Sequence, residues 1–297
     1  MTNSAKRVLI TGSRGFTGVY MAGEMAAAGY QVIGLGSQPA ADENYVQANL
    51  NDADELNRHI REIQPDIVIH LAALAFVGHG DPKAFYDVNL VGTRNLLQSL
   101  ANSQHRPEAI LVASSANVYG NSSEGQLDEQ TAPQPANDYA VSKLAMEYMT
   151  KLWMPQLPMI ITRPFNYTGV GQAENFLLPK IVSHFRRKAD VIELGNVDVA
   201  RDFSDVRSLV AAYRRLIEAG AFGQTVNVCS GRTYSLREII SLCSEISNHE
   251  IEIKVNPEFV RKNEVRTLSG DNGLLKTLIG EWEVPPIRET LHWMLNA

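Results

Sequence analysis

Short apolar runs alternate with amphipathic stretches along the first half of the chain. Five runs have the length and composition of buried strands: residues 6–11, 31–35, 66–71, 109–114 and 158–162. Four intervening stretches carry apolar side chains at helical spacing: residues 16–28, 52–63, 82–102 and 138–152. Strands that alternate with helices predict an α/β fold, in which a doubly wound parallel sheet is covered by helices on both faces.

Beyond Arg163 the pattern loosens, and short strands and Gly/Pro turns separate the helical stretches. Pro285 and Pro286 precede a final predicted helix. We predict a main domain over residues 1–163 and a smaller C-terminal α/β substrate-binding lobe over residues 164–297, interleaved with it and bordering a cleft at the strand ends. Three helices are expected in this lobe: residues 176–187, 206–218 and 235–247.

Length and charge narrow the function classes. The 297 residues can bury a core without disulfides or a structural metal. Twenty-seven basic against thirty-three acidic residues give a net charge of -6, the wrong sign for broad contact with nucleic acid. Cys229 and Cys243 form no Cys-x-x-Cys pair and no histidines cluster at metal-ligand spacing, so we expect reduced thiols and no metal.

The apolar stretch at residues 67–77 is shorter than the roughly 20 residues that span a bilayer. The first predicted strand begins within a few residues of the N-terminus and leaves no room for a signal peptide. We therefore expect a cytoplasmic protein without a membrane partner.

A glycine-rich turn joins the first predicted strand to the first helix. Gly12 permits the tight turn, Gly15 lets the backbone approach a pyrophosphate, and Gly18 allows close packing of helix on strand. The spacing is Gly-x-x-Gly-x-x-Gly rather than Gly-x-Gly-x-x-Gly. Strand, turn and helix together predict a dinucleotide site in a Rossmann-type sheet.

The end of the second predicted strand bears on the choice of cofactor. A carboxylate there would bind a ribose 2′-OH, but residues 34–38 contain none and the first acid is Asp42. Arg14 can pair with a 2′-phosphate, although an arginine in this turn is equally compatible with a solvated side chain. The pattern favours NADP(H) over NAD(H).

Tyr139 and Lys143 stand four residues apart on a predicted helix, so their side chains share one face. A phenol has a pKa of about 10, but an adjacent ammonium and a cationic nicotinamide ring both favour the phenolate and lower this pKa. The pair follows the predicted strand that leads to Ser115, whose hydroxyl can reach the same substrate oxygen. These three residues are the candidate catalytic group.

At this point the chain resembles the extended short-chain dehydrogenase/reductase family, from Val8 almost to its C-terminus. Beside the glycine turn, the matching segments are residues 70–73, Asn89 with Gly92 and Thr93, residues 115–120, Tyr139 with Lys143, and residues 163–166. The resemblance implies that Tyr139 is the general acid/base, that Lys143 binds the nicotinamide ribose, and that Ser115 hydrogen-bonds the reacting oxygen.

The resemblance also implies a nucleotide-sugar substrate and a homodimer formed through the helices at residues 82–102 and 138–152. His70, a single histidine near a strand end, is expected to be structural. The expected cofactor contacts, besides Tyr139 and Lys143, are Gly12, Arg14, Gly15, Phe16, Gly18, Ser37, Leu50, Leu71, Ala72, Ala73, Asn89 and Arg163.

The residue at position 117 bears on the reaction type. Sugar 4,6-dehydratases resemble this chain but carry an acid where Asn117 stands, and the reductases that also epimerise C3 and C5 carry a cysteine there. An amide has no basic lone pair with which to remove a C5 proton. Simple hydride chemistry at a ring carbon remains, as a 4-keto reductase or a 4-epimerase.

The C-terminal half offers arginines for a diphosphate. The segments at residues 201–206 and 261–265 resemble those that hold the nucleotide in GDP-sugar dehydratases and reductases. Residues 163–172 resemble the matching segment of GDP-mannose-derived enzymes, with Tyr167 in place of His and Val170 in place of Pro. The expected substrate contacts are Asn117, Asn166, Lys180, Arg201, Arg261 and Glu264.

Three hypotheses follow. The first is NAD(P)H-dependent reduction of the C4 ketone of GDP-4-keto-6-deoxy-D-mannose to a GDP-6-deoxyhexose of the rhamnose or talose type, with Tyr139 as proton donor. The second is an NAD-dependent nucleotide-sugar 4-epimerase. The third is a non-catalytic regulator that senses the cofactor, a class that usually lacks the active tyrosine that this chain keeps.

Overall fold

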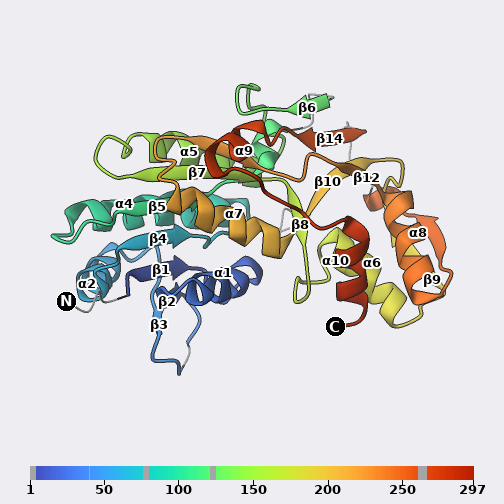
Figure 1. Ribbon diagram of the computed structural model, residues 1–297, viewed down its shortest axis with the longest axis horizontal. Helices are drawn as coiled ribbons and strands as arrows, with labels where there is room; N and C mark the ends of the chain where they lie inside the picture. Colours follow the sequence, from blue (N-terminus) through green and yellow to red (C-terminus); the bar gives the residue numbers. More distant parts are fainter. Residues whose placement is uncertain (1–4, 40, 76–79, 121–124, 260–265) are drawn as a thin grey trace.

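The computed structural model describes residues 5–39, 41–75, 80–120, 125–259 and 266–297. Within these ranges seven strands form a parallel sheet in the order β11-β7-β5-β4-β1-β2-β3 (Figure 1). This strand order confirms the predicted Rossmann-type doubly wound fold. The strands are β1 (Arg7–Thr11), β2 (Gln31–Gly36), β3 (Tyr45–Gln47), β4 (Ile67–His70), β5 (Ala109–Ala113), β7 (Met159–Pro164) and β11 (Thr225–Val228).

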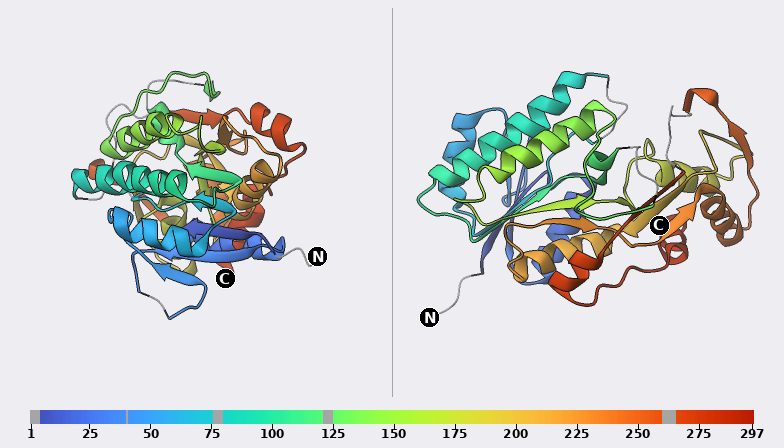
Figure 2. Two further views of the ribbon diagram at one scale, coloured as in Figure 1. Left: turned by 90° about the vertical axis from the view of Figure 1, so that its left-hand side faces the viewer. Right: turned by 90° about the horizontal axis from the view of Figure 1, so that it is seen from above.

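Helices cover both faces of the sheet, as Figure 2 shows in its right-hand view. On one face lie α1 (Phe16–Ala27), α7 (Val206–Glu218) and α9 (Gly273–Ile279). On the other face lie α2 (Ala53–Ile63), α4 (Thr93–Asn102) and α5 (Asp138–Lys151). Met21 and Met25 of α1 belong to the first core layer, and Leu56 of α2 and Met146 of α5 to the second. Burial of these apolar faces is the main stabilising term of the fold.

The predicted helix over residues 82–102 is not a regular α-helix throughout. It consists of α3 (Pro82–Tyr86), a π-helical segment η1 (Asp87–Gly92) and α4. In η1 the amide of Asn89 hydrogen-bonds the backbone of Leu74, and a side chain at Gly92 would come within 2.9 Å of Leu50. The wider turn is thus tied to the loop that follows β4, which is a common use of π-helical segments near functional sites.

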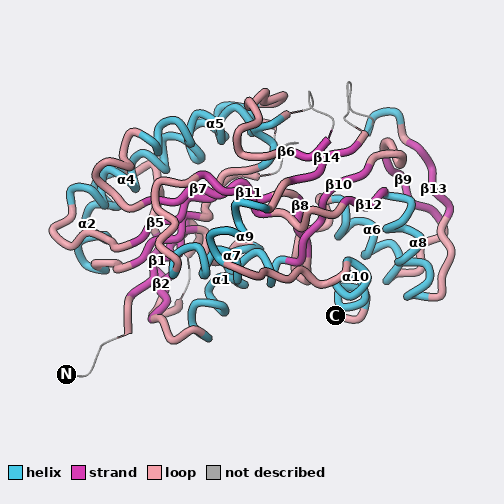
Figure 3. The backbone as a smooth tube through the Cα atoms, turned by 45° about the horizontal axis from the view of Figure 1, so that its top comes forward, coloured by secondary structure: helices cyan, strands magenta, loops and turns pink. Residues whose placement is uncertain are grey.

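A second sheet has the order β12-β10-β14-β6, with β8 also paired to β10 (Figure 3). Its strands are β6 (Gly125–Leu127), β8 (Asn166–Thr168), β10 (Ala200–Asp205), β12 (Thr233–Ser235) and β14 (Thr267–Gly270). Beyond it lie α6 (Leu177–Arg186), α8 (Leu236–Ser247), α10 (Ile287–Leu295) and the paired strands β9 (Val191–Leu194) and β13 (Glu252–Val255). Short 3-10 helices occur at η2 (Ala116–Tyr119) and η3 (Pro257–Phe259).

The two halves of the chain are interleaved at the main sheet. The boundary expected at Arg163 falls inside β7, and β11 from the second half pairs with β7 in parallel. The helices α6, α8 and α10 share a separate apolar core that includes Phe185, Ile239 and Leu291. Cys229 and Cys243 are buried free thiols.

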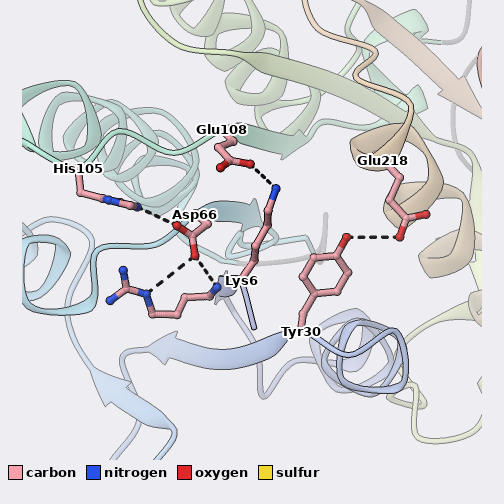
Figure 4. A network of polar contacts seen from close by, with 7 residues as sticks. Lys6, Tyr30, Asp66, His105, Glu108 and Glu218 are labelled. Carbon is pink, nitrogen blue, oxygen red and sulfur yellow. Dashed lines mark hydrogen bonds and ion pairs between the residues drawn. The ribbon is translucent and has the colours of Figure 1, made fainter. Parts of the chain in front are cut away.

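A polar network joins the amino-terminal ends of the central strands (Figure 4). The Asp66 carboxylate accepts a hydrogen bond from the backbone of Arg7 at 2.7 Å and lies 2.9 Å from His105. Lys6, directly before β1, pairs with Glu108, directly before β5, at 2.5 Å. These contacts fix the strand ends opposite the carboxyl edge, where the candidate site lies.

Candidate active site

The glycine turn forms a cradle at the carboxyl end of β1. Gly12 has φ +69°, and a side chain there would come within 2.9 Å of the backbone of Ala72. A Cβ at Gly18 would lie 2.1 Å from the carbonyl oxygen of Gly12, which in turn accepts the backbone N–H of Gly15 at 2.9 Å. Only glycine permits this approach, and the turn leads into the N-terminus of α1. The residues fit a dinucleotide pyrophosphate.

One side chain in the cradle is left without a partner. The Ser13 hydroxyl is buried and has no hydrogen-bond partner among the described residues. A Cβ at Gly34 on the neighbouring strand would lie 2.3 Å from it. An unpaired buried hydroxyl costs free energy, which a polar ligand group in the cradle would recover.

The edge beside β2 holds Arg14 in a defined place. Its guanidinium lies 4.7 Å from the ring centroid of Tyr45, and the Tyr45 hydroxyl donates to the carbonyl of Gln38 at 2.8 Å. The Ser37 carbonyl accepts the side-chain amide of Gln47 at 3.2 Å. Arg14 is thus oriented on an aromatic ring rather than free in solvent.

Other predicted cofactor contacts line the loop after β4. The backbone N–H of Leu71 donates to the Thr11 carbonyl at 3.2 Å, and that of Ala72 donates to the Thr11 hydroxyl at 3.2 Å. Ala73 follows in the same loop, and Leu50 is buried against Gly92 of η1. The structure therefore gathers these residues at the carboxyl edge of the sheet.

Ser115 and Tyr139 are in contact. The Ser115 hydroxyl is near enough to the Tyr139 phenol to lower its pKa, and it accepts the backbone N–H and the side-chain amide of Asn117, each at 3.1 Å. Because both Asn117 groups are donors, the Ser115 proton is free to be donated to an oxygen in the site. That this hydroxyl reaches the substrate oxygen stays a prediction.

The protonation of Tyr139 differs from the sequence-based expectation. Burial raises the pKa of Tyr139 to about 12, while the Ser115 hydrogen bond lowers it and the nearby Tyr167 phenol raises it. The lowering expected from Lys143 is not among the causes of this shift, and desolvation of the phenolate is the largest one. At neutral pH the phenol therefore holds its proton.

Lys143 lies one turn after Tyr139 and is almost wholly buried. Its ammonium donates to the carbonyl of Ala113 at 2.8 Å. Burial lowers the pKa of Lys143 to about 8, and the negative charge of Glu147 raises it. An ammonium with such a pKa is about nine-tenths protonated at pH 7 and loses its charge in the weakly alkaline range.

Arg163 and Asn89 have partners within the protein. Both Nε and Nη2 of Arg163 donate to Glu147, at 2.9 and 2.7 Å, and Nη1 donates to Tyr119 at 3.0 Å. The Asn89 amide bonds Leu74 and donates to Ser142 at 3.0 Å. The Arg163 guanidinium thus takes part in an internal ion pair and Asn89 holds the loop after β4, and the contact of each with the cofactor stays a prediction.

The predicted substrate residues come from several elements. Asn117 is exposed on η2, and the Asn166 amide donates to the Asp202 carbonyl at 3.3 Å. Arg201 on β10 donates to the carbonyls of Ala200 at 2.9 Å and Arg266 at 3.4 Å. These residues lie on or beside the second sheet.

Of the remaining predicted contacts, only Lys180 lies within the described residues. Lys180 donates to the Glu193 carbonyl at 2.7 Å and lies 4.6 Å from the Phe259 ring centroid. Arg261 and Glu264 fall outside the described residues.

Tyr167, which the sequence analysis singled out only as a departure from the family segment, lies close to the candidate catalytic residues. Its hydroxyl lies 2.8 Å from that of Thr17 in the first turn of α1, and its ring is stacked on Phe16 with centroids 6.1 Å apart. The nearby Tyr167 phenol raises the pKa of Tyr139. Tyr167 therefore joins the glycine-turn helix to strand β8 beside the candidate catalytic phenol.

Tyr45 and Glu147 were also missed. Tyr45 contacts Arg14 and Glu147 contacts Arg163, and both partners are far away in the sequence, so no local motif identifies Tyr45 or Glu147.

Across the described ranges, no three His, Cys, Asp or Glu side chains gather as metal ligands would. Every helix in those ranges is too short or too polar to cross a bilayer.

The family model for GDP-mannose 4,6 dehydratase matches residues 9–285. The chain belongs to this family. The match runs from the glycine cradle to the segment before α10, and it confirms the predicted resemblance to nucleotide-sugar enzymes of the extended short-chain dehydrogenase/reductase type.

Two relatives match almost end to end. GDP-6-deoxy-D-talose 4-dehydrogenase of Aggregatibacter actinomycetemcomitans is 35% identical over 97% of this chain and 96% of its own length. GDP-6-deoxy-D-mannose reductase of Pseudomonas aeruginosa is 34% identical over 98% and 96%.

Solved structures agree with the fold. A candidate epimerase from Burkholderia cenocepacia is 51% identical with a TM-score of 0.93, covering 98% of this chain and 97% of that one. RMD from Pseudomonas aeruginosa, complexed with NADPH, is 33% identical with a TM-score of 0.86 and covers 98% of both chains.

Proposed function

We propose that this protein reduces the C4 ketone of GDP-4-keto-6-deoxy-D-mannose to a GDP-6-deoxyhexose, with NADPH as the reductant. The observation that carries the proposal is that Ser115, Tyr139 and Lys143 are buried together at the same sheet edge as the glycine cradle, with the Tyr139 phenol protonated. The two relatives that match almost end to end bear the names of a dehydrogenase and a reductase of GDP-6-deoxyhexoses.

The chain's own residues supply the proton chemistry. Bound NADPH supplies the hydride. Tyr139 holds a proton at neutral pH and can give it to the C4 oxygen as that oxygen gains charge. Ser115 orients the ketone oxygen and stabilises the phenolate left behind, and the Lys143 ammonium adds a positive charge nearby. One hydride and one proton convert the ketone to a secondary alcohol.

The second sheet supplies the proposed grip on the sugar nucleotide. We assign Arg201 to the diphosphate, because a guanidinium offers paired donors to phosphate oxygens. Asn166 lies on β8, which is paired directly to β10, the strand that carries Arg201. Asn117 and Lys180, with Arg261 and Glu264 of the segment outside the described residues, complete the proposed set.

NADP(H) is the favoured cofactor. Arg14, held on the Tyr45 ring, offers a cation to a 2′-phosphate at the edge where residues 34–38 carry no carboxylate. The relative RMD is complexed with NADPH, which supports this preference.

A homodimer is proposed through α5 and η1. Val141, Tyr148 and Leu152 lie on or just after α5 at spacings that share one helical face, and all three are exposed. Val91 of η1 is also exposed. An apolar stripe of this kind is typical of a surface that a partner helix covers.

A nucleotide-sugar 4-epimerase is the second candidate, because the Burkholderia cenocepacia structure is described as a candidate epimerase. An epimerase oxidises and re-reduces the same carbon, so it retains its cofactor and consumes no added reductant. The two functions therefore differ in their demand for NADPH.

The test incubates the purified protein with GDP-4-keto-6-deoxy-D-mannose and NADPH and follows absorbance at the NADPH band. Stoichiometric loss of NADPH with a new C4 alcohol, identified by NMR of the product, supports the reductase. Interconversion of GDP-hexoses without added NADPH supports the epimerase. Cofactor binding without either reaction supports a regulator and overturns the proposal.

A further inference from the structure

A buried ion pair lies behind the candidate catalytic residues. Glu147 and Arg163 are 1% and 4% exposed, and two Arg163 nitrogens meet the two carboxylate oxygens at 2.9 and 2.7 Å. The Ser114 hydroxyl donates to the same carboxylate at 2.5 Å. Although burial lowers the pKa of Arg163, its hydrogen bond to Glu147 raises it, and so does the Glu147 charge. The Glu147 carboxylate thus accepts three hydrogen bonds, which hold it in one orientation.

The pair touches both sides of the site. Glu147 lies one helical turn after Lys143 on α5, so their side chains share a face. Ser114 precedes Ser115 at the carboxyl end of β5, and Arg163 donates to Tyr119 of η2. Glu147 therefore connects the Lys143 helix to the strand end that carries Ser115.

Glu147 supplies the negative charge that offsets the positive charge of the Lys143 ammonium. His70 from β4 is buried and neutral, since burial and the Lys143 charge lower the pKa of His70 to about 3. Tyr139 of the same helix is neutral, because burial raises its pKa to about 12. Among the described groups that influence the Lys143 pKa, Glu147 is the one that carries a negative charge.

We propose that Glu147 is a positioning residue whose carboxylate, one helical turn from Lys143, keeps Lys143 protonated at neutral pH, and that Arg163 holds the carboxylate in place for that purpose. The proposal rests on the proposed function insofar as Lys143 serves the cofactor and Tyr139. In this proposal Arg163 affects cofactor binding through Glu147 and Lys143. The proposal also explains why a buried arginine and glutamate occur where an apolar pair would pack as well.

The direction of the titration follows from these contacts. Lys143 loses its charge as the pH rises through about 8, the value to which burial lowers its pKa against the opposing effect of Glu147. Replacing the Glu147 carboxylate with an amide keeps the shape and removes the charge. The Lys143 pKa then falls further, and the ammonium is lost at a lower pH.

The test measures NADPH affinity by fluorescence titration from pH 6 to pH 10, without any sugar. We expect Glu147→Gln to bind NADPH about fivefold more weakly than wild type at pH 8, to approach a tenfold difference above pH 9, and to bind nearly equally well at pH 6, which corresponds to a downward shift of about one pH unit. Recovery at low pH distinguishes lost charge from a damaged fold. Titrations that coincide, or that shift to higher pH, overturn the inference.

Two variants separate charge from structure. Glu24→Gln breaks the ion pair of Glu24 with Arg214, 2.7 Å long on α1 and α7, and its titration should follow wild type. If Glu147→Gln folds poorly because Arg163 is left unpaired, the double variant Glu147→Gln with Arg163→Met removes both charges. Its titration should show the same shift.

The binding measurement is independent of the sugar reaction. If the ketone is not reduced but the NADPH titration shifts, the proposed function fails and this inference stands. If reduction is observed and the titrations coincide, the inference fails alone.

Discussion

The Thr11 hydroxyl and Nδ1 of His70 lie 2.7 Å apart in the interior, where β1 meets β4. Nε2 of the same ring lies 2.8 Å from the Thr93 hydroxyl, which itself donates to the Asn89 carbonyl at 2.7 Å. Since Thr93 has given away its proton, Nε2 must carry the ring proton and Nδ1 must accept from Thr11. His70 is therefore fixed as one neutral tautomer that joins the glycine strand to η1. This agrees with the structural role predicted for it.

The buried His70 predicts a specific loss of stability in acid. Burial lowers the pKa of His70 from 6.5 to about 3, and the Lys143 charge adds to this effect. Below pH 6.5 the unfolded chain binds a proton at His70 that the folded chain does not bind, so stability is lost as the pH falls towards 3. The free energy of unfolding then falls by up to about 1.4 kcal/mol per pH unit. Urea unfolding at several pH values measures it.

The control is a variant without the titrating group. His70→Gln should unfold with a pH slope that is shallower than wild type by this amount between pH 6 and pH 4. Parallel slopes for His70→Gln and wild type would contradict the assigned neutral state.

Tyr139→Phe is expected to lower kcat by about 10²–10⁴-fold, because a general acid is lost from the transition state. The phenyl ring still packs against Phe85, 6.0 Å away between centroids, so NADPH affinity should change little. Tyr148→Phe on the same helix, where Tyr148 is exposed, is the matched control and should retain wild-type kcat. A loss of only tenfold in Tyr139→Phe would assign the proton to another group.

Periodicity sufficed for the elements that bury one face. Helix α2 and strand β4 were predicted because Leu56 and Ile60 repeat at helical spacing and residues 67–70 are uniformly apolar. The π-helical segment was not predicted, since it depends on the contact between Asn89 and Leu74, which are distant in sequence. Helix α9 was also missed, because its seven residues are too few for a clear pattern.

Sequence motifs predicted those parts of the candidate site whose geometry follows from residue spacing alone. Glycine spacing identified the cradle, and helical spacing placed Tyr139 and Lys143 on one face. The direction of the Tyr139 pKa was wrong, because burial depends on the whole fold. Arg163 was assigned to the cofactor from its motif alone, whereas its partner Glu147 becomes visible only when α5 and β7 are placed side by side.

Arg14→Ala is expected to weaken binding of 2′,5′-ADP about tenfold or more while leaving 5′-ADP nearly unchanged, because one charge-assisted phosphate contact is lost. Tyr45→Leu should give a smaller loss in the same direction, since the ring orients the guanidinium from 4.7 Å. Arg288→Ala, which removes an exposed arginine of α10, is the control. Isothermal titration of the two nucleotides measures the difference, and equal losses for both would remove Arg14 from cofactor choice.

The apolar stripe on α5 predicts how the proposed dimer can be broken. Tyr148 and Leu152 are 61% and 75% exposed, so introducing glutamates there should leave the monomer folded while placing desolvated charges in the interface. Light scattering of Tyr148→Glu with Leu152→Glu should report about half the wild-type mass, where wild type has twice 32.8 kDa. Val19→Glu, at a 59% exposed valine of α1, should stay dimeric. A wild type that scatters as a monomer, or a double variant that keeps the wild-type mass, would rule out this face, because four exposed apolar side chains would then lie outside any contact.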